Sequence, residues 1–121
     1  MVNYLARLVV ADNTGIRVVQ CINLLGKSKS SISRIGSIIV IVTKRLFTWS
    51  RFKKGLITRG LIVRSCLEFI RGAGVWVKFS HNAVILINKK KAPIAKRLKG
   101  PFIKELCIQY NLLGTVTRFL V

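Results

Sequence analysis

The sequence has 121 residues, 51% of them hydrophobic, and it carries 22 lysines and arginines against three aspartates and glutamates. This length fits one domain and leaves no room for a second core. A formal net charge of +19 predicts a polyanionic partner, because a compact chain so charged repels itself, and the hydrophobic content excludes a disordered basic tail.

The apolar runs are too short for a membrane protein. The longest stretch without a charged residue runs from Leu106 to Thr117 and includes Gln109 and Asn111, whereas a spanning helix needs about 20 apolar residues. Residues 1–8 show neither the apolar core of a signal peptide nor the features of a transit peptide, so we expect no import sequence.

The N-terminal part of the sequence predicts a β-hairpin, with two strands joined by a turn. Leu5–Ala11 and Arg17–Leu25 flank Asp12-Asn13-Thr14-Gly15, whose residue types favour a tight turn. The next run, Ser37–Thr43, is apolar and β-branched, which predicts a central strand buried on both faces.

Three further runs complete the set of strands. They are Thr58–Cys66, Val75–Phe79 and Ala83–Asn88, and Arg71–Gly74 forms a hairpin-like turn between the first two. Short strands separated by turns predict a small all-β barrel. After Gly100-Pro101, the spacing of Phe102, Ile103, Leu106 and Tyr110 predicts one apolar face of a short helix. The helix is expected to begin near Pro101 and to end near Asn111, and Gly114 interrupts the apolar tail that follows.

Three basic connections separate these elements, at residues 27–34, 44–54 and 89–99. The second also contains Phe47, Trp49 and Phe52. Aromatic rings beside cations can stack on bases while the cations pair with phosphates. The alternative, which we favour for the rings, is packing of the aromatic residues against the stem of their own hairpin.

The side chains required for catalysis are scarce. Asp12, Glu68 and Glu105 are the only carboxylates and fall in different elements, so neither a carboxylate pair nor a two-metal site is expected. The sole histidine, His81, has no sequence signature of a nucleophilic site, and Gly72-Ala73-Gly74 lacks the rest of a dinucleotide fingerprint. We predict a protein that is not an enzyme.

Three cysteines, Cys21, Cys66 and Cys107, are odd in number and widely spaced. This pattern argues against a disulfide framework and a zinc site, and it favours a reducing compartment. We expect three buried small hydrophobic side chains, no metal and no cofactor.

Several landmarks in order resemble the family of the universal large-subunit ribosomal protein numbered fourteen. The resemblance extends from about residue 5 to residue 110, and its specificity comes from order and spacing. The landmarks are Ala11-Asp12-Asn13-Thr14-Gly15, Cys21-Ile22, Ile35-Gly36, Lys53-Lys54-Gly55, Leu61-Ile62-Val63-Arg64, Phe79, Asn82-Ala83, and Gly100-Pro101 with Lys104-Glu105-Leu106.

The resemblance implies a mainly β fold: a five-stranded antiparallel β-barrel with a projecting β-ribbon and a small C-terminal helical lobe. We therefore expect one domain over residues 1–121, with the barrel at about 1–90 and the lobe at about 91–121. It also implies a structural constituent of the large ribosomal subunit that binds large-subunit rRNA and contributes to the intersubunit interface and to bridges with small-subunit rRNA. Implied protein partners are large-subunit proteins three and nineteen and a ribosome-silencing factor, with no membrane.

By the same resemblance, Arg51, Lys53 and Lys54 correspond to the basic ribbon of the family, Arg64 closes its apolar strand and Arg97 precedes Gly-Pro. Basic residues in the connections and at strand ends extend this set. The residues expected to contact RNA are Arg17, Lys27, Lys29, Arg34, Lys44, Arg45, Arg51, Lys53, Lys54, Arg64, Arg71, Lys78, Arg97 and Lys99.

The sequence departs from the family pattern chiefly because it lacks acidic residues at several positions. Ser37, Leu56, Ser80 and His81 stand where the family usually has acidic residues or an acidic turn, and Lys96 replaces a small or hydroxylated residue. The family's C-terminal signature is replaced by residues 114–121, so docking of the silencing factor is in question. This acid-poor, Ile- and Lys-rich usage suggests a protein of the mitochondrial matrix, in a mitochondrial ribosome, with a plastid or the bacterial cytoplasm as the alternative.

The charge is compatible with two other classes of function. A free-standing basic nucleic-acid chaperone would fit the charge but not the ordered landmarks. A membrane-surface protein requires a basic amphipathic helix, and the one predicted helix carries only Lys104 against Glu105.

Overall fold

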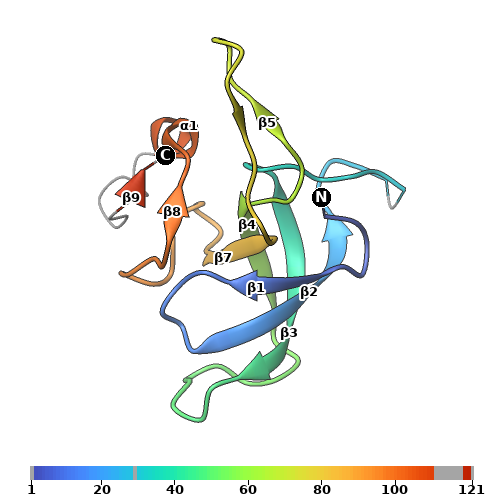
Figure 1. Ribbon diagram of the computed structural model, residues 1–121. Coiled ribbons are helices and arrows are strands. Elements are labelled where there is room, and N and C mark those ends of the chain that lie inside the picture. Colours follow the sequence, from blue (N-terminus) through green and yellow to red (C-terminus); the bar gives the residue numbers. More distant parts are fainter. Residues whose placement is uncertain (1, 29, 111–118, 121) are drawn as a thin grey trace.

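Five strands close into a barrel in this computed structural model, which describes residues 2–28, 30–110 and 119–120 (Figure 1). The strand order around the barrel is β1-β2-β3-β4-β7. The predicted five-stranded barrel is therefore confirmed. The barrel strands are β1 (Arg7–Val10), β2 (Ile16–Leu24), β3 (Ile38–Leu46), β4 (Ile57–Arg64) and β7 (Ala83–Ile87).

One pairing differs from the expected antiparallel arrangement. Four of the five pairs are antiparallel, but β1 and β7 pair in parallel, with Val9 opposite Ala83 and Val10 opposite Val84. The reason is geometric: strand direction cannot alternate all the way around a closed ring with an odd number of strands. The closing pair of this barrel is therefore the parallel one.

The core is divided into two clusters that share β4 and β7. Val84 and Leu86 point into the barrel, whereas Ala83, Ile85 and Ile87 belong to a second cluster formed with the C-terminal segment. Because side chains alternate along a strand, β7 is buried on both faces. The prediction of a doubly buried strand at Ser37–Thr43 was wrong, since alternate residues of β3 are only half-buried.

A two-stranded arm projects from the barrel (Figure 1). It consists of β5 (Phe69–Ile70) and β6 (Trp76–Val77), and its turn is closed by a bond from the Arg71 amide to the Val75 carbonyl of 2.8 Å. The predicted turn is confirmed, but Val75–Phe79 yields only a two-residue strand that pairs with β5. The projecting ribbon is thus this arm, and Arg51, Lys53 and Lys54, which the resemblance assigns to the ribbon, lie instead on the β3–β4 loop at residues 47–56.

The C-terminal segment packs against the outside of the barrel. β8 (Pro101–Phe102) pairs in parallel with β9 (Phe119–Leu120), and α1 (Lys104–Gln109) follows β8. The helix begins three residues later than predicted, because Pro101 belongs to a strand whose partner is distant in sequence. Asn111, Gly114 and most of the divergent tail at 114–121 lie outside the described residues.

The cysteines and the helix bear on two further expectations. Cys21 is buried and Cys107 half-buried, but Cys66 is exposed just beyond the end of β4, so the prediction of three buried thiols was wrong for Cys66. Within the described part of the chain, no helix has the length and apolarity needed to cross a membrane.

Candidate functional site

Three connections from different parts of the chain meet at one end of the barrel, which we call the groove end. They are the β1–β2 turn (residues 11–15), the β3–β4 loop (47–56) and the β7–β8 connection (88–100). The Phe47 amide donates to the Gly15 carbonyl at 2.8 Å, and the Lys99 amide donates to the Ala11 carbonyl at 2.7 Å. The turn is therefore held between the other two segments.

Gly15 allows the turn and the β3–β4 loop to approach closely. Its φ of +83° is a conformation that side chains disfavour, and an added Cβ would lie 2.7 Å from the Ser50 Cβ and 3.0 Å from the Ser50 Cα. The Ser50 hydroxyl donates to the Thr14 carbonyl at 3.1 Å and accepts from the Phe52 amide at 3.2 Å. The loop is thus fixed over the turn by its own backbone and side chains.

Asp12 anchors the turn to the barrel wall. Its Oδ2 accepts from the Leu86 amide at 2.9 Å, and its Oδ1 accepts from the Thr14 hydroxyl at 2.6 Å and from the Thr14 amide at 3.3 Å. The side chain is buried. Burial raises the pKa of the Asp12 carboxyl above its ordinary value, although the bonds from Thr14 and Leu86 and the charge of Lys99 oppose this effect.

We expect the raised pKa of Asp12 to make the stability of the fold depend on pH. The folded state keeps the proton to a higher pH than the unfolded chain, whose carboxyl titrates near 3.8. The contribution of Asp12 to the free energy of unfolding is therefore greatest below that pH and falls as the pH rises through the folded-state pKa. Urea denaturation between about pH 3 and pH 7 measures this dependence, and Asp12→Asn should remove its part. A stability difference between the two proteins that stays constant with pH would contradict the expectation.

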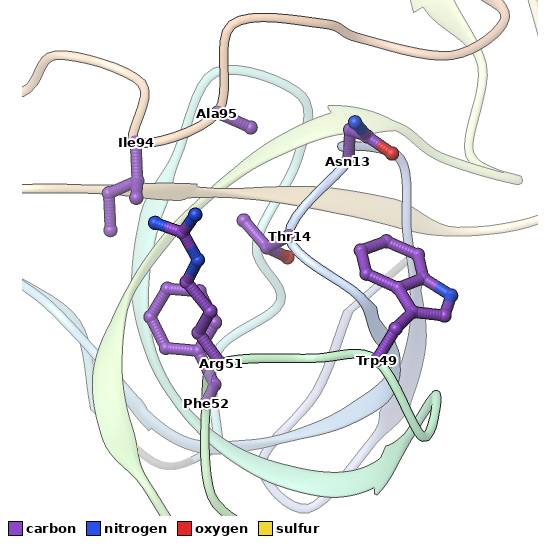
Figure 2. Close-up of a pocket in the computed structure, with 7 residues that line it drawn as sticks. All are labelled: Asn13, Thr14, Trp49, Arg51, Phe52, Ile94 and Ala95. Carbon is purple, nitrogen blue, oxygen red and sulfur yellow. The ribbon is translucent and has the colours of Figure 1, made fainter.

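The three connections enclose a groove of about 460 Å³ at this end of the barrel (Figure 2). Figure 2 shows Trp49 and Arg51 on opposite sides of the groove with Thr14 between them. Each connection contributes to its lining, which consists of Asn13, Thr14, Trp49, Arg51, Phe52, Ile94 and Ala95.

The aromatic residues of the β3–β4 loop divide into two kinds. Phe52 is half-buried and packs against the barrel core, as the packing interpretation predicted. Phe47 and Trp49 are exposed instead, and their rings stack on each other with centroids 5.7 Å apart and an interplanar angle of 12°. The Arg17 guanidinium lies 5.1 Å from the centre of the Phe47 ring, within the range of a cation–π contact.

The structure gathers most of the predicted basic residues at the groove end. Arg17 is the second residue of β2, two basic residues lie near the end of β3, and the rest lie on the β3–β4 loop and the β7–β8 connection. All are exposed except Lys44, which is half-buried. This cluster comprises Arg17, Lys44, Arg45, Arg51, Lys53, Lys54, Arg97 and Lys99.

Other predicted residues lie elsewhere. Lys27 and Arg34 are exposed on the β2–β3 connection at the opposite end, and Lys78 follows β6 of the arm. Arg71 pairs with Glu105 of α1, with 2.8 Å between Nε and Oε1, so its charge is already matched. Lys29 lies outside the described residues.

Arg64 is an interior residue. Its Nη2 donates to the Lys99 carbonyl, its Nη1 donates to His81 Nε2 at 3.4 Å, and its guanidinium lies 5.6 Å from the centre of the Phe102 ring. Burial lowers the pKa of Arg64, although a guanidinium remains charged in proteins. Arg64 joins β4 to the C-terminal segment, and with only 7% of the residue exposed it offers little surface for the predicted RNA contact.

The predicted set also omits basic residues that share the groove end. The run Lys89-Lys90-Lys91 and the nearby Lys96 are exposed on the β7–β8 connection. The signal for them was visible as the basic run at 89–99. Among the residues that the structure describes, no group of three or more His, Cys, Asp and Glu side chains could hold a metal ion.

A closed β-barrel that gathers cationic side chains over three connecting segments is typical of a protein that binds nucleic acid. The comparison with protein families agrees and is more specific, since the family model described as ribosomal protein L14p/L23e matches residues 1–116. This match covers nearly the whole chain, so the chain belongs to that family, and the resemblance seen in the sequence is confirmed. It is therefore a structural constituent of the large ribosomal subunit, located in a ribosome, and it is not an enzyme.

Proposed function

We propose that the chain binds large-subunit rRNA through the groove end of its barrel. The observation that carries this proposal is the distribution of charge: eight predicted basic residues gather there, together with Lys96 and the run 89–91. The one side-chain carboxylate at this end, Asp12, is buried and bonded to the turn and to β7. Such a surface attracts phosphates over its whole extent.

Counterion release gives the proposal a quantitative form. Each phosphate that a lysine or arginine neutralises releases counterions from the RNA, so affinity falls as salt rises, with a slope that reports the number of contacts. The charge of +19 exceeds the number of contacts, because Arg64 is interior and Arg71 is paired with Glu105. The slope counts the residues that contact phosphates.

We expect the double variant Arg51→Ala/Lys53→Ala to weaken binding to large-subunit rRNA while the fold persists. Both side chains are exposed on the β3–β4 loop, so their removal leaves the core intact. The slope of log K against log salt should become shallower by roughly two units, about one for each lost phosphate contact. Filter binding over a range of salt concentrations measures this slope.

Lys27→Ala/Arg34→Ala is a matched control, because it also removes one lysine and one arginine, both exposed, but from the opposite end of the barrel. Its slope should change less than that of the Arg51/Lys53 variant. Equal slopes for the two double variants would assign the binding to general charge and not to the groove end.

The family resemblance supports finer proposals about position. We propose that the chain lies at the intersubunit interface, contributes to bridges with small-subunit rRNA, and neighbours large-subunit proteins three and nineteen, with a silencing factor as a further partner. The loss of acid at Ser37, Leu56, Ser80 and His81 supports a mitochondrial ribosome as its location. A density map of the parent ribosome tests all of these proposals together.

A further inference from the structure

We propose that the groove end holds one unstacked base of RNA against the indole of Trp49, with the neighbouring phosphate at Arg51. This inference rests on the proposed RNA binding and adds to it a specific site. It turns one part of a broad cationic surface into a position that recognises a base, whereas phosphate contacts alone carry no information about bases.

The exposure of Trp49 is the first observation. The side chain is 58% exposed although tryptophan is among the largest apolar residues. Phe47 stacks on one face of the indole at 5.7 Å, which leaves the other face without a ring partner in the described residues. An aromatic face that is held in place and open to solvent is the surface on which unpaired bases stack.

The groove beside Trp49 supplies the rest of a nucleotide site. Its volume of about 460 Å³ falls within the usual range of small-molecule sites. Arg51 lies across the groove from the indole, where a guanidinium can pair with a phosphate oxygen in two parallel bonds (Figure 2). Asn13 also lines the groove and is exposed, so its side-chain amide offers a donor and an acceptor for the edge of a base.

The β3–β4 loop holds the stacking surface in advance of binding. Ser50 lies between Trp49 and Arg51 in sequence and is bonded through its hydroxyl to the Thr14 carbonyl. Phe47, at the start of the loop, is bonded through its amide to Gly15. Because the residues that flank Trp49 are fixed to the turn, little conformational entropy is lost when a base stacks on it.

The charge around the groove selects RNA over a peptide as the occupant. Arg17 and Lys99 line a pocket together with Phe47 and Trp49, and Arg17 lies over the Phe47 ring. Arg51 lines the groove on the other side of Trp49. No exposed side-chain carboxylate is present at the groove end among the described residues. Single-stranded RNA carries one phosphate for every base, and this arrangement matches the alternation of rings and cations.

An RNA duplex with one bulged adenosine, compared with the same duplex carrying an abasic nucleotide in the bulge, tests the proposal. The protein is the full chain with Trp76→Phe, so that Trp49 is the only tryptophan. We expect the bulged base to quench the fluorescence of Trp49 and to bind about tenfold more tightly than the abasic bulge. In the Trp49→Ala protein this difference should disappear, and in Trp49→Phe, which keeps an aromatic face, most of it should remain.

Trp76→Ala is the matched control, since Trp76 has a similar exposure, 60%, but lies on the arm. It should preserve the difference between the base and the abasic bulge. Equal affinities for the two duplexes, or a difference that survives Trp49→Ala, would overturn the stacking site and leave the proposed RNA binding standing. Failure of the chain to bind either duplex at low salt would overturn the proposed function itself.

Discussion

Replacing Asp12 with alanine is expected to lower the free energy of unfolding by about 2–4 kcal/mol at neutral pH. The variant loses the acceptor for the Leu86 amide, which lies in a fully buried stretch of β7, and the acceptor for the hydroxyl and amide of Thr14. Each buried donor left without a partner costs about 1–3 kcal/mol. Urea denaturation followed by far-ultraviolet circular dichroism measures the change.

Asp12→Asn separates the two acceptor roles of this side chain, toward Leu86 and toward Thr14. The amide keeps one oxygen acceptor and nearly the same volume, but it cannot accept at both positions, so a smaller loss than that of Asp12→Ala is expected. A loss in Asp12→Ala below about 1 kcal/mol would show that water replaces the carboxylate as acceptor and that the anchor contributes little. The affinity of the groove end for RNA should also fall, and it should fall further in the variant that destabilises the β1–β2 turn more, because this turn carries Asn13 and Thr14.

The second large effect is expected for Arg64→Ala, at about 2–4 kcal/mol in the free energy of unfolding. The substitution removes a nearly buried side chain, leaves the Lys99 carbonyl without its donor and vacates the space between β4 and Phe102. Gly100 fits against this guanidinium, since an added Cβ there would lie 2.8 Å from Arg64 Nη1. The C-terminal segment should therefore detach from β4 more readily, which urea denaturation and protease sensitivity both report.

Arg59→Ala provides the control for Arg64→Ala. Arg59 lies on the same strand but is exposed, so its loss should change stability by less than about 0.5 kcal/mol. The two roles proposed for basic residues also differ in their salt dependence. Arg64→Ala should leave the slope of RNA binding unchanged under conditions where the protein is folded, and a shallower slope would mean that Arg64 contacts phosphate after all.

The local features of the fold could be predicted because they depend on residues near one another in sequence. Asp12-Asn13-Thr14-Gly15 identified the β1–β2 turn, and the apolar runs identified all five barrel strands to within a few residues. The features that were missed depend on distant pairing. The parallel contact of Val9 with Ala83 and the pairing of Pro101 with Phe119 leave no mark in local periodicity.

The candidate site shows the same division between local and distant information. The sequence located the basic connections, but it could not distinguish Arg64, which is buried, from Arg51, which is exposed, because each lies next to one apolar or aromatic residue. It also could not show that Phe52 would pack inward while Phe47 and Trp49 stack outward. That distinction follows from the bonds of Gly15 and Ser50, which fix the path of the loop; the bond from Ser50 to Thr14 joins residues 36 apart in sequence.

The closure of the barrel by its first and last strands has a consequence for how the protein is made. Val9 cannot pair with Ala83, and Asp12 cannot bond to Leu86, until β7 has been synthesised. The groove likewise needs Ile94 and Ala95 beside the turn. A growing chain therefore has the aromatic loop long before it has the groove, which can form only after Leu86, Ile94 and Ala95 have been synthesised.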